Sequence, residues 1–110
     1  VIRKVAAEGP CVLVGRCADY ILRENPDCIS VFISASRQDR IHRAMEYNHI
    51  GEKEAEEYIR KADKSRASYY NYYTDKVWGA AESYDLCINT SLYGIEKTID
   101  FIRAFVEARL

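Results

Sequence analysis

The sequence lacks the short motifs by which many enzymes can be recognised. Its 110 residues contain no G-x-x-x-x-G-K-[ST] phosphate loop, no G-x-S-x-G nucleophile motif and no dinucleotide-binding fingerprint. The four cysteines form no CxxC pair, and His42 and His49 are too isolated to suggest a metal site or a proton shuttle. We therefore expect no bound metal, and we expect the cysteines to be buried free thiols of a reduced cytosolic protein.

Excess charge and long apolar runs are also missing. The chain carries 16 basic and 17 acidic side chains, a formal net charge of -1, so bulk charge provides no attraction to nucleic acid or to an acidic membrane. No apolar stretch approaches the roughly 20 residues needed to span a bilayer. These absences predict a soluble, cytoplasmic protein without nucleic-acid or membrane partners.

What is present is an alternation of short apolar runs and amphipathic segments. Runs at 11–14, 28–33 and 84–88 predict three buried strands. Helical patterns cover 1–8, 17–23, 37–47, 52–73 and a last segment from about 95 to the end, and Ser36, three residues before Asp39, resembles a capping box. Short strands alternating with helices predict one domain, a three-layer α/β/α fold around a short parallel sheet.

The ends of the predicted strands carry polar residues. In parallel sheets ligands bind beyond the carboxyl ends of the strands, which here are the turns at 15–16, 35–37 and 89–91. Arg16 directly follows Gly15 at the end of the first predicted strand. A guanidinium group at that place is suited to a bidentate grip on phosphate.

Two clusters of basic residues flank a short hinge at Gly51. The first comprises Arg37, Arg40 and Arg43, and the second comprises Arg60, Lys61, Lys64 and Arg66, with Asp63 among them. Each cluster alone fits a solvated helix face about as well as an anion site. Their combination favours an anion site.

Aromatic residues are concentrated at the end of the long predicted helix. They are Tyr69, Tyr70, Tyr72, Tyr73 and Trp78. Stacking on a nucleobase is one use for them, but packing against the sheet is the favoured interpretation.

Taken in order, these segments resemble the C-terminal portion of bacterial cytidylate kinases, and in particular the cytidylate kinase-like group. The matching segments are Val12–Arg16, Ala35–Ser36 before an arginine-rich helix, Asp63–Ala67, Tyr69–Tyr70, Trp78–Gly79, Asn89–Ser91 and Gly94–Glu96. The resemblance extends from about residue 5 to residue 103. It depends on the order of the segments, because each is short.

The resemblance implies a partial P-loop NTPase-type kinase fold and transfer of phosphate from ATP to CMP or dCMP with Mg²⁺. Arg16 would hold the acceptor phosphate, and Asp63 and Arg66 would reach the acceptor nucleotide. Residues of about 37–74 would form a lid, in which Arg40 and Arg43 bind substrate and Arg60, Lys64 and Arg66 act in catalysis.

Two positions depart from the family pattern. Cys17 stands where an acidic residue commonly follows the Gly-Arg pair, and Ile59 stands where an arginine is expected.

The sequence also lacks the N-terminal half that carries the phosphate loop in that family. We therefore interpret residues 1–110 as one partial domain, inactive alone and without tightly bound ATP or Mg²⁺. Its partners in the intact protein would be a nucleoside monophosphate and ATP, and exposed sheet edges would favour a homo-oligomer. The alternative is a non-enzymatic, kinase-derived module that binds anions or another protein.

Overall fold

Two short parallel strands, β1 (Val31–Ser34) and β2 (Leu86–Asn89), form the sheet of the molecule. The structure, a computed structural model, describes residues 1–15 and 17–109. Val31 lies opposite Leu86 and Ser34 opposite Asn89. The prediction of a mixed α/β fold with a short parallel sheet is confirmed.

The predicted strand at 11–14 is wrong. These residues have no regular structure, and the side chains of Val12 and Val14 are 91% and 89% exposed. A strand exists only where a neighbour satisfies its backbone N–H and C=O groups, and within the described residues no such neighbour lies beside 11–14. The two strands that do form begin later than predicted, at Val31 and Leu86.

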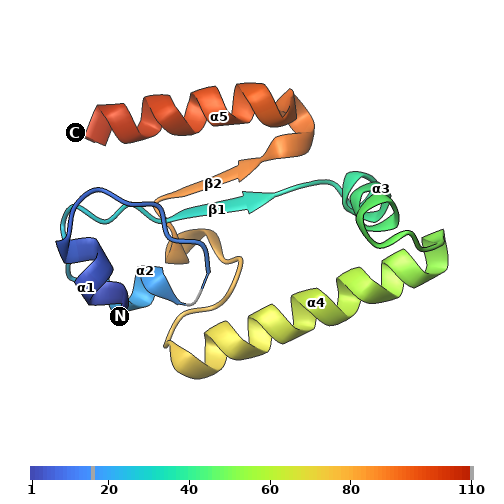
Figure 1. Cartoon of the computed structure of the whole chain (residues 1–110), viewed down its shortest axis with the longest axis horizontal. Coiled ribbons are helices and arrows are strands. Elements are labelled where there is room, and N and C mark those ends of the chain that lie inside the picture. Colours follow the sequence, from blue (N-terminus) through green and yellow to red (C-terminus); the bar gives the residue numbers. More distant parts are fainter. Residues whose placement is uncertain (16, 110) are drawn as a thin grey trace.

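Helix α5 (Thr90–Arg109) covers one face of the sheet (Figure 1). It directly follows β2, and its first turn is interrupted at Gly94, where φ is 81°. Thr98 donates its hydroxyl hydrogen bond to the Gly94 carbonyl at 2.7 Å, and the side chain of Thr98 is buried. The regular part of α5 thus begins at Ile95, as the sequence predicted.

Aromatic side chains pack near the sheet on the side opposite α5. The Phe32 ring of β1 lies 4.9 Å from the Tyr84 ring and 5.3 Å from Trp78, between ring centroids. Tyr84 in turn stacks on Tyr70, at 6.2 Å. A Cβ atom at Gly79 would lie only 3.6 Å from Phe32, so the loop passes close to the ring.

The packing interpretation of the aromatic segment is therefore confirmed for Tyr70 and Trp78 and wrong for the other three tyrosines. Tyr69, Tyr72 and Tyr73 are 49%, 81% and 59% exposed and contact one another instead.

Helices α3 (Arg37–Asn48) and α4 (Glu52–Tyr73) form a hairpin that we call the arm. Its turn lies beyond the ends of the strands, and α4 runs back on the side of the sheet opposite α5 (Figure 1). His49, at φ 52°, ends α3, and Gly51 precedes α4. Among the described residues α4 packs extensively only against α3. The radius of gyration, 15.5 Å, exceeds the roughly 13 Å typical of a compact domain of this length, because the arm extends outward.

The N-terminal segment contributes two short helices, α1 (Ile2–Ala7) and α2 (Ala18–Ile21), which contact each other. A short 3-10 helix, η1 (Ala81–Ser83), precedes β2. Helix α2 is shorter than the predicted 17–23 segment. None of the helices in the described part of the chain is long and apolar enough to cross a membrane.

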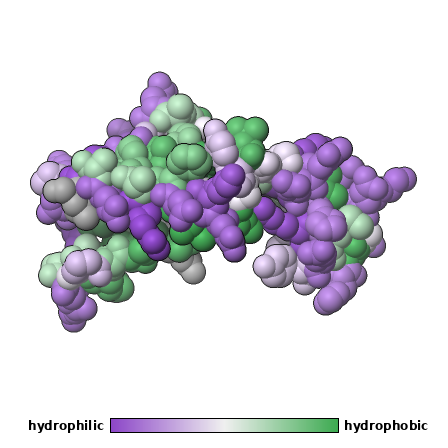
Figure 2. All heavy atoms as spheres, turned by 90° about the horizontal axis from the view of Figure 1, so that it is seen from above, coloured by the Kyte–Doolittle hydropathy of each residue, from purple (hydrophilic) through white to green (hydrophobic). Residues whose placement is uncertain are grey.

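Little of the apolar surface is buried. Figure 2 shows hydrophobic residues gathered around the α5 side of the molecule, whereas the lobe formed by α3 and the adjoining end of α4 is mainly hydrophilic. Ile33, Leu92 and Ile95 are all more than half exposed. The expectation of buried cysteines is correct for Cys17 and wrong for two others, because Cys11 and Cys87 are exposed.

The start of α3 depends on Ser36, whose hydroxyl accepts a hydrogen bond from the Asp39 N–H at 3.2 Å. Ser36→Ala removes this acceptor, so we expect the free energy of unfolding to fall by about 1 kcal/mol. Urea denaturation followed by circular dichroism measures the change. The control is Ser65→Ala on the exposed middle of α4, which should leave stability unchanged or slightly higher. Equal effects of the two substitutions would contradict the assignment of the cap.

Tyr70 gives a second prediction, on alkaline stability. Burial raises the pKa of the Tyr70 phenol, and its hydrogen bond to Asp19 raises that pKa further. The unfolded chain loses this proton near pH 10 while the folded chain keeps it, so the stability that Tyr70 contributes is present below pH 10 and lost above it. Relative to Tyr70→Phe, the wild-type free energy of unfolding should fall by up to about 1.4 kcal/mol per pH unit above pH 10.

Denaturation curves between pH 8 and 11 test this expectation. Tyr72→Phe, at a side chain that is 81% exposed, should keep the wild-type slope. A Tyr70→Phe curve parallel to wild type would show that the phenol is not protected.

Candidate functional site

The arm contains a groove between α3 and α4 with a volume of ≈ 370 Å³. Ala44 and Ala55 are buried, and such small side chains let the two helices approach closely. Arg40 and Arg43 line the groove from α3, and Arg66 lines it from α4. Tyr47, Tyr58 and Ile59 also line it. The groove is therefore basic and partly aromatic.

An ion pair ties the two helices together at this groove. Arg40 Nη2 of α3 lies 2.5 Å from Asp63 Oδ1 of α4, and the two side chains are only 34% and 28% exposed. A charge-assisted hydrogen bond with this degree of burial is stronger than an ordinary surface pair. It fixes Asp63 beside the groove and neutralises Arg40.

The other two arginines of the groove have no such partner. Within the described residues, no carboxylate oxygen lies within 4.0 Å of the guanidinium nitrogens of Arg43 or Arg66. Like charges held close together in one groove repel, and a bound anion relieves this repulsion. The groove can therefore accept an anion with at least two oxygen atoms.

Only part of each predicted basic cluster lines the groove. Arg60 and Lys64 do not line the groove. Arg60 donates from Nε to Glu57 at 3.1 Å, and this hydrogen bond lowers the pKa of the Glu57 carboxyl. Arg37 lies 3.9 Å from Glu56. Asp63, Arg66, Arg40 and Arg43 come together, whereas the roles expected for Arg60 and Lys64 stay predictions.

Arg16 lies outside the described residues, so its position relative to the groove is not described. Its neighbours form a tight turn: Ala18 N–H donates to the Gly15 carbonyl at 3.2 Å, and Cys17 adopts a left-handed φ of 55°. Burial and the nearby Asp19 both raise the pKa of the Cys17 thiol. Cys17 therefore places a neutral side chain in this turn.

The polar residues that follow the two strands meet at one edge, as expected for parallel strands. Ser36 N–H donates to Ser91 Oγ at 2.7 Å, and the Thr90 hydroxyl donates to the Ser34 carbonyl at 3.1 Å. These hydroxyl groups join the start of α3 to the start of α5. The turns therefore act as the joint between the arm and the sheet.

Sequence reasoning missed Asp19 and Tyr70 as a pair. Tyr70 is only 6% exposed, and its phenol donates a hydrogen bond to Asp19 Oδ2 at 2.7 Å. This contact joins the C-terminal end of α4 to the first turn of α2. The two residues are 51 positions apart, so no local pattern could have indicated it.

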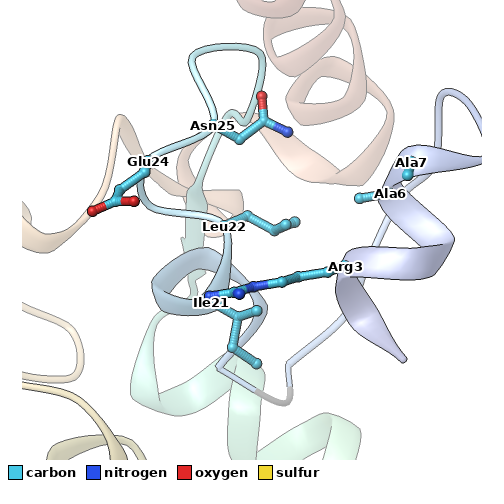
Figure 3. A pocket seen from close by; sticks show the side chains of 7 residues that line it. All are labelled: Arg3, Ala6, Ala7, Ile21, Leu22, Glu24 and Asn25. Carbon is cyan, nitrogen blue, oxygen red and sulfur yellow. The ribbon is translucent and has the colours of Figure 1, made fainter.

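A second hollow, of ≈ 310 Å³, lies between α1 and α2, away from the arm. Its lining combines apolar residues with charged and polar ones, namely Ala6, Ala7, Ile21 and Leu22 with Arg3, Glu24 and Asn25. Figure 3 shows Arg3 reaching across from α1 toward Ile21. Because its one cation, Arg3, shares the lining with the Glu24 carboxylate, this hollow is a poorer phosphate site than the groove of the arm.

The Arg40–Asp63 contact can be measured with a double-mutant cycle of Arg40→Ala and Asp63→Ala. Because the pair is partly buried and joins two helices, we expect a coupling energy of about 1 kcal/mol in the free energy of unfolding. The matched cycle of Arg60→Ala and Glu57→Ala, within one exposed helix face, should give a smaller coupling. A larger coupling for that second pair would contradict our description of the groove.

Comparisons with known proteins agree with this picture. The model of the cytidylate kinase-like family matches residues 1–92. A crystal structure of an uncharacterized protein from Eubacterium ventriosum ATCC 27560 is 36% identical and superposes with a TM-score of 0.94. The alignment covers 97% of this chain and 61% of that one, so the chain spans less than two thirds of its structural relative. No curated protein matches. With a basic groove between two helices beside a parallel sheet, and a family match over most of its length, the chain belongs to the cytidylate kinase-like family.

Proposed function

We propose that the intact protein is a nucleoside monophosphate kinase that transfers phosphate from ATP to CMP or dCMP. The observation that carries this proposal is the convergence of Arg40, Arg43 and Arg66 on one groove. Phosphoryl transfer requires positioning and charge neutralisation more than covalent chemistry by the protein, and guanidinium groups provide both. The family match supports the same reaction class.

Each residue of the groove has a role in this proposal. Arg43 and Arg66, which have no carboxylate partner in the described part of the chain, bind phosphate oxygens. Arg40 is held by Asp63 until the anion arrives and then shares its guanidinium group between the two. Asp63, freed in part, accepts a hydrogen bond from a hydroxyl group of the acceptor nucleotide. Arg60 and Lys64 do not line the groove and would reach phosphate only when the arm closes.

Movement of the arm fits its construction. The chain enters the arm between Ser34 and Ser36 and leaves it after Tyr73, so the far end of the arm, at Gly51, can move without breaking the β1–β2 ladder while the Tyr70 end of α4 stays held by Asp19. Closure over the substrates would exclude water, which strengthens every charge interaction in the groove and prevents wasteful hydrolysis.

This proposal places ATP and Mg²⁺ on polypeptide outside residues 1–110. The chain has no glycine-rich phosphate loop. Within the described residues, no three His, Cys, Asp or Glu side chains are grouped to hold a metal ion. The residues described here therefore do not fit either group, and the groove is assigned to the transferred and accepting phosphates.

We also propose that residues 1–110 form one part of a larger P-loop NTPase-type kinase domain in the cytoplasm. Ile33 of β1 is exposed, as are the apolar residues Val12 and Val14, and further strands would cover such surfaces. This chain covers 61% of the structural relative, and the rest of that relative's chain is long enough to contain such strands. The 110-residue chain alone should therefore be inactive.

A coupled kinase assay on the intact protein tests the function. With Mg²⁺-ATP and a panel of CMP, dCMP, UMP and AMP, we expect turnover that is fastest with CMP or dCMP. Arg66→Ala should lower kcat/KM by about ten- to hundredfold, the loss expected for one charge-assisted hydrogen bond. Arg103→Ala, an exposed arginine of α5, is the matched control and should retain wild-type kcat/KM.

Absence of turnover with every monophosphate would overturn the kinase proposal. If the protein then still bound pyrophosphate through Arg66, the result would favour the alternative, a kinase-derived module that binds anions without catalysis.

A further inference from the structure

Near its C-terminal end, α4 is joined to α2 by a part-buried hydrogen bond. The Tyr70 phenol donates to Asp19 Oδ2 at 2.7 Å, and the Tyr70 residue is only 6% exposed. Its ring stacks on Tyr84, which stacks on Phe32 of β1. The stacking fixes the position of the Tyr70 ring, and the hydrogen bond connects its hydroxyl group to Asp19 of α2.

This hydrogen bond joins α2 to the helix that carries part of the proposed site. Asp19 is in the first turn of α2, which begins immediately after the tight turn at Gly15 and Cys17. Arg66, which lines the groove, lies one helical turn before Tyr70, a rise of about 6 Å along α4. The contact therefore joins the end of the 11–15 segment to the helix that carries the groove.

Because α4 is long, a small change in its angle at Tyr70 produces a large displacement further along the helix. A tilt of about 10° about Tyr70 would displace the helix axis at Asp63 by about 2 Å, because seven residues of helix rise about 10 Å. Displacements of this size in a phosphoryl-transfer site reduce the rate strongly. Within the described residues α4 packs extensively only against α3, which moves with it, so the arm itself provides no correction.

We propose that Tyr70 is a positioning residue of the kinase site, which sets the angle of the arm through its hydrogen bond to Asp19. This inference rests on the proposed function, because it assigns Tyr70 to the geometry of that site. Tyr70 does not touch substrate. It fixes the positions of Arg66 and Asp63 relative to the turn that begins at Gly15.

The test uses Tyr70→Phe in the intact protein, because this substitution keeps the stacked ring and removes only the hydroxyl group. We expect KM for the monophosphate to rise about three- to tenfold, the range that one ordinary hydrogen bond corresponds to, with a smaller change in kcat. Tyr69→Phe is the matched control, at a neighbouring tyrosine that is 49% exposed, and should leave both parameters unchanged.

Substitutions of the partner separate positioning from general stability. Asp19→Asn keeps an oxygen acceptor for the phenol and should retain a KM near wild type. Asp19→Leu removes the acceptor and should raise KM as much as Tyr70→Phe does. The double variant Tyr70→Phe/Asp19→Leu should be no worse than either single one. Emission of Trp78, the single tryptophan, should stay unchanged in Tyr70→Phe, because Trp78 packs on Phe32.

Hydrogen exchange gives a readout that does not depend on catalysis. In Tyr70→Phe the backbone amides of 17–22 and 70–75 should exchange several-fold faster than in wild type, and in Tyr69→Phe they should not. Wild-type turnover combined with an unchanged KM and unchanged exchange in Tyr70→Phe would overturn this inference alone. Absence of turnover in the wild-type protein would overturn the proposed function and, with it, the role assigned to Tyr70.

Discussion

A stack of three aromatic rings connects the sheet to the longest helix, and the position of every groove residue on α4 depends on it. Phe32 belongs to β1, Tyr84 precedes β2, and Tyr70 lies near the end of α4. Each ring buries a large apolar area, and offset stacking adds a preference for one orientation. Without the stack, the arm would be joined to the rest of the molecule by its two chain connections and by hydrogen bonds such as Ser36–Ser91 and Tyr70–Asp19.

The arm and the sheet region are stabilised in different ways. The sheet region depends on apolar burial, although much of its apolar surface is still exposed. The arm is hydrophilic and is held by small buried alanines and by the Arg40–Asp63 pair. Moving such an arm away from the sheet region costs little free energy, because water can solvate most of its surface. This difference suits the proposed function, in which the arm presents arginines to a charged ligand.

Features with a local cause were predictable from the sequence. The bounds of α4 agree with the predicted 52–73 segment, because a glycine before it and an acidic first turn are local signals. The prediction of a strand at 11–14 is wrong because four apolar residues do not determine whether a neighbouring strand exists. The charge spacing placed Arg40 and Arg43 on one face, but the rotation of α4, which turns Arg66 inward and Arg60 outward, is set by packing on α3. The Asp19–Tyr70 contact depends on the whole fold and left no trace in local sequence.

The arm lies entirely between β1 and β2 in the chain, although these two strands are neighbours in the sheet. Folding must therefore close a loop of about fifty residues before the ladder can form, and the entropy lost in doing so grows only slowly with loop length. Contacts between α3 and α4 are close in sequence and can form before that closure. A helical hairpin that forms early would shorten the effective loop, so the topology favours assembly from the arm inward to the sheet.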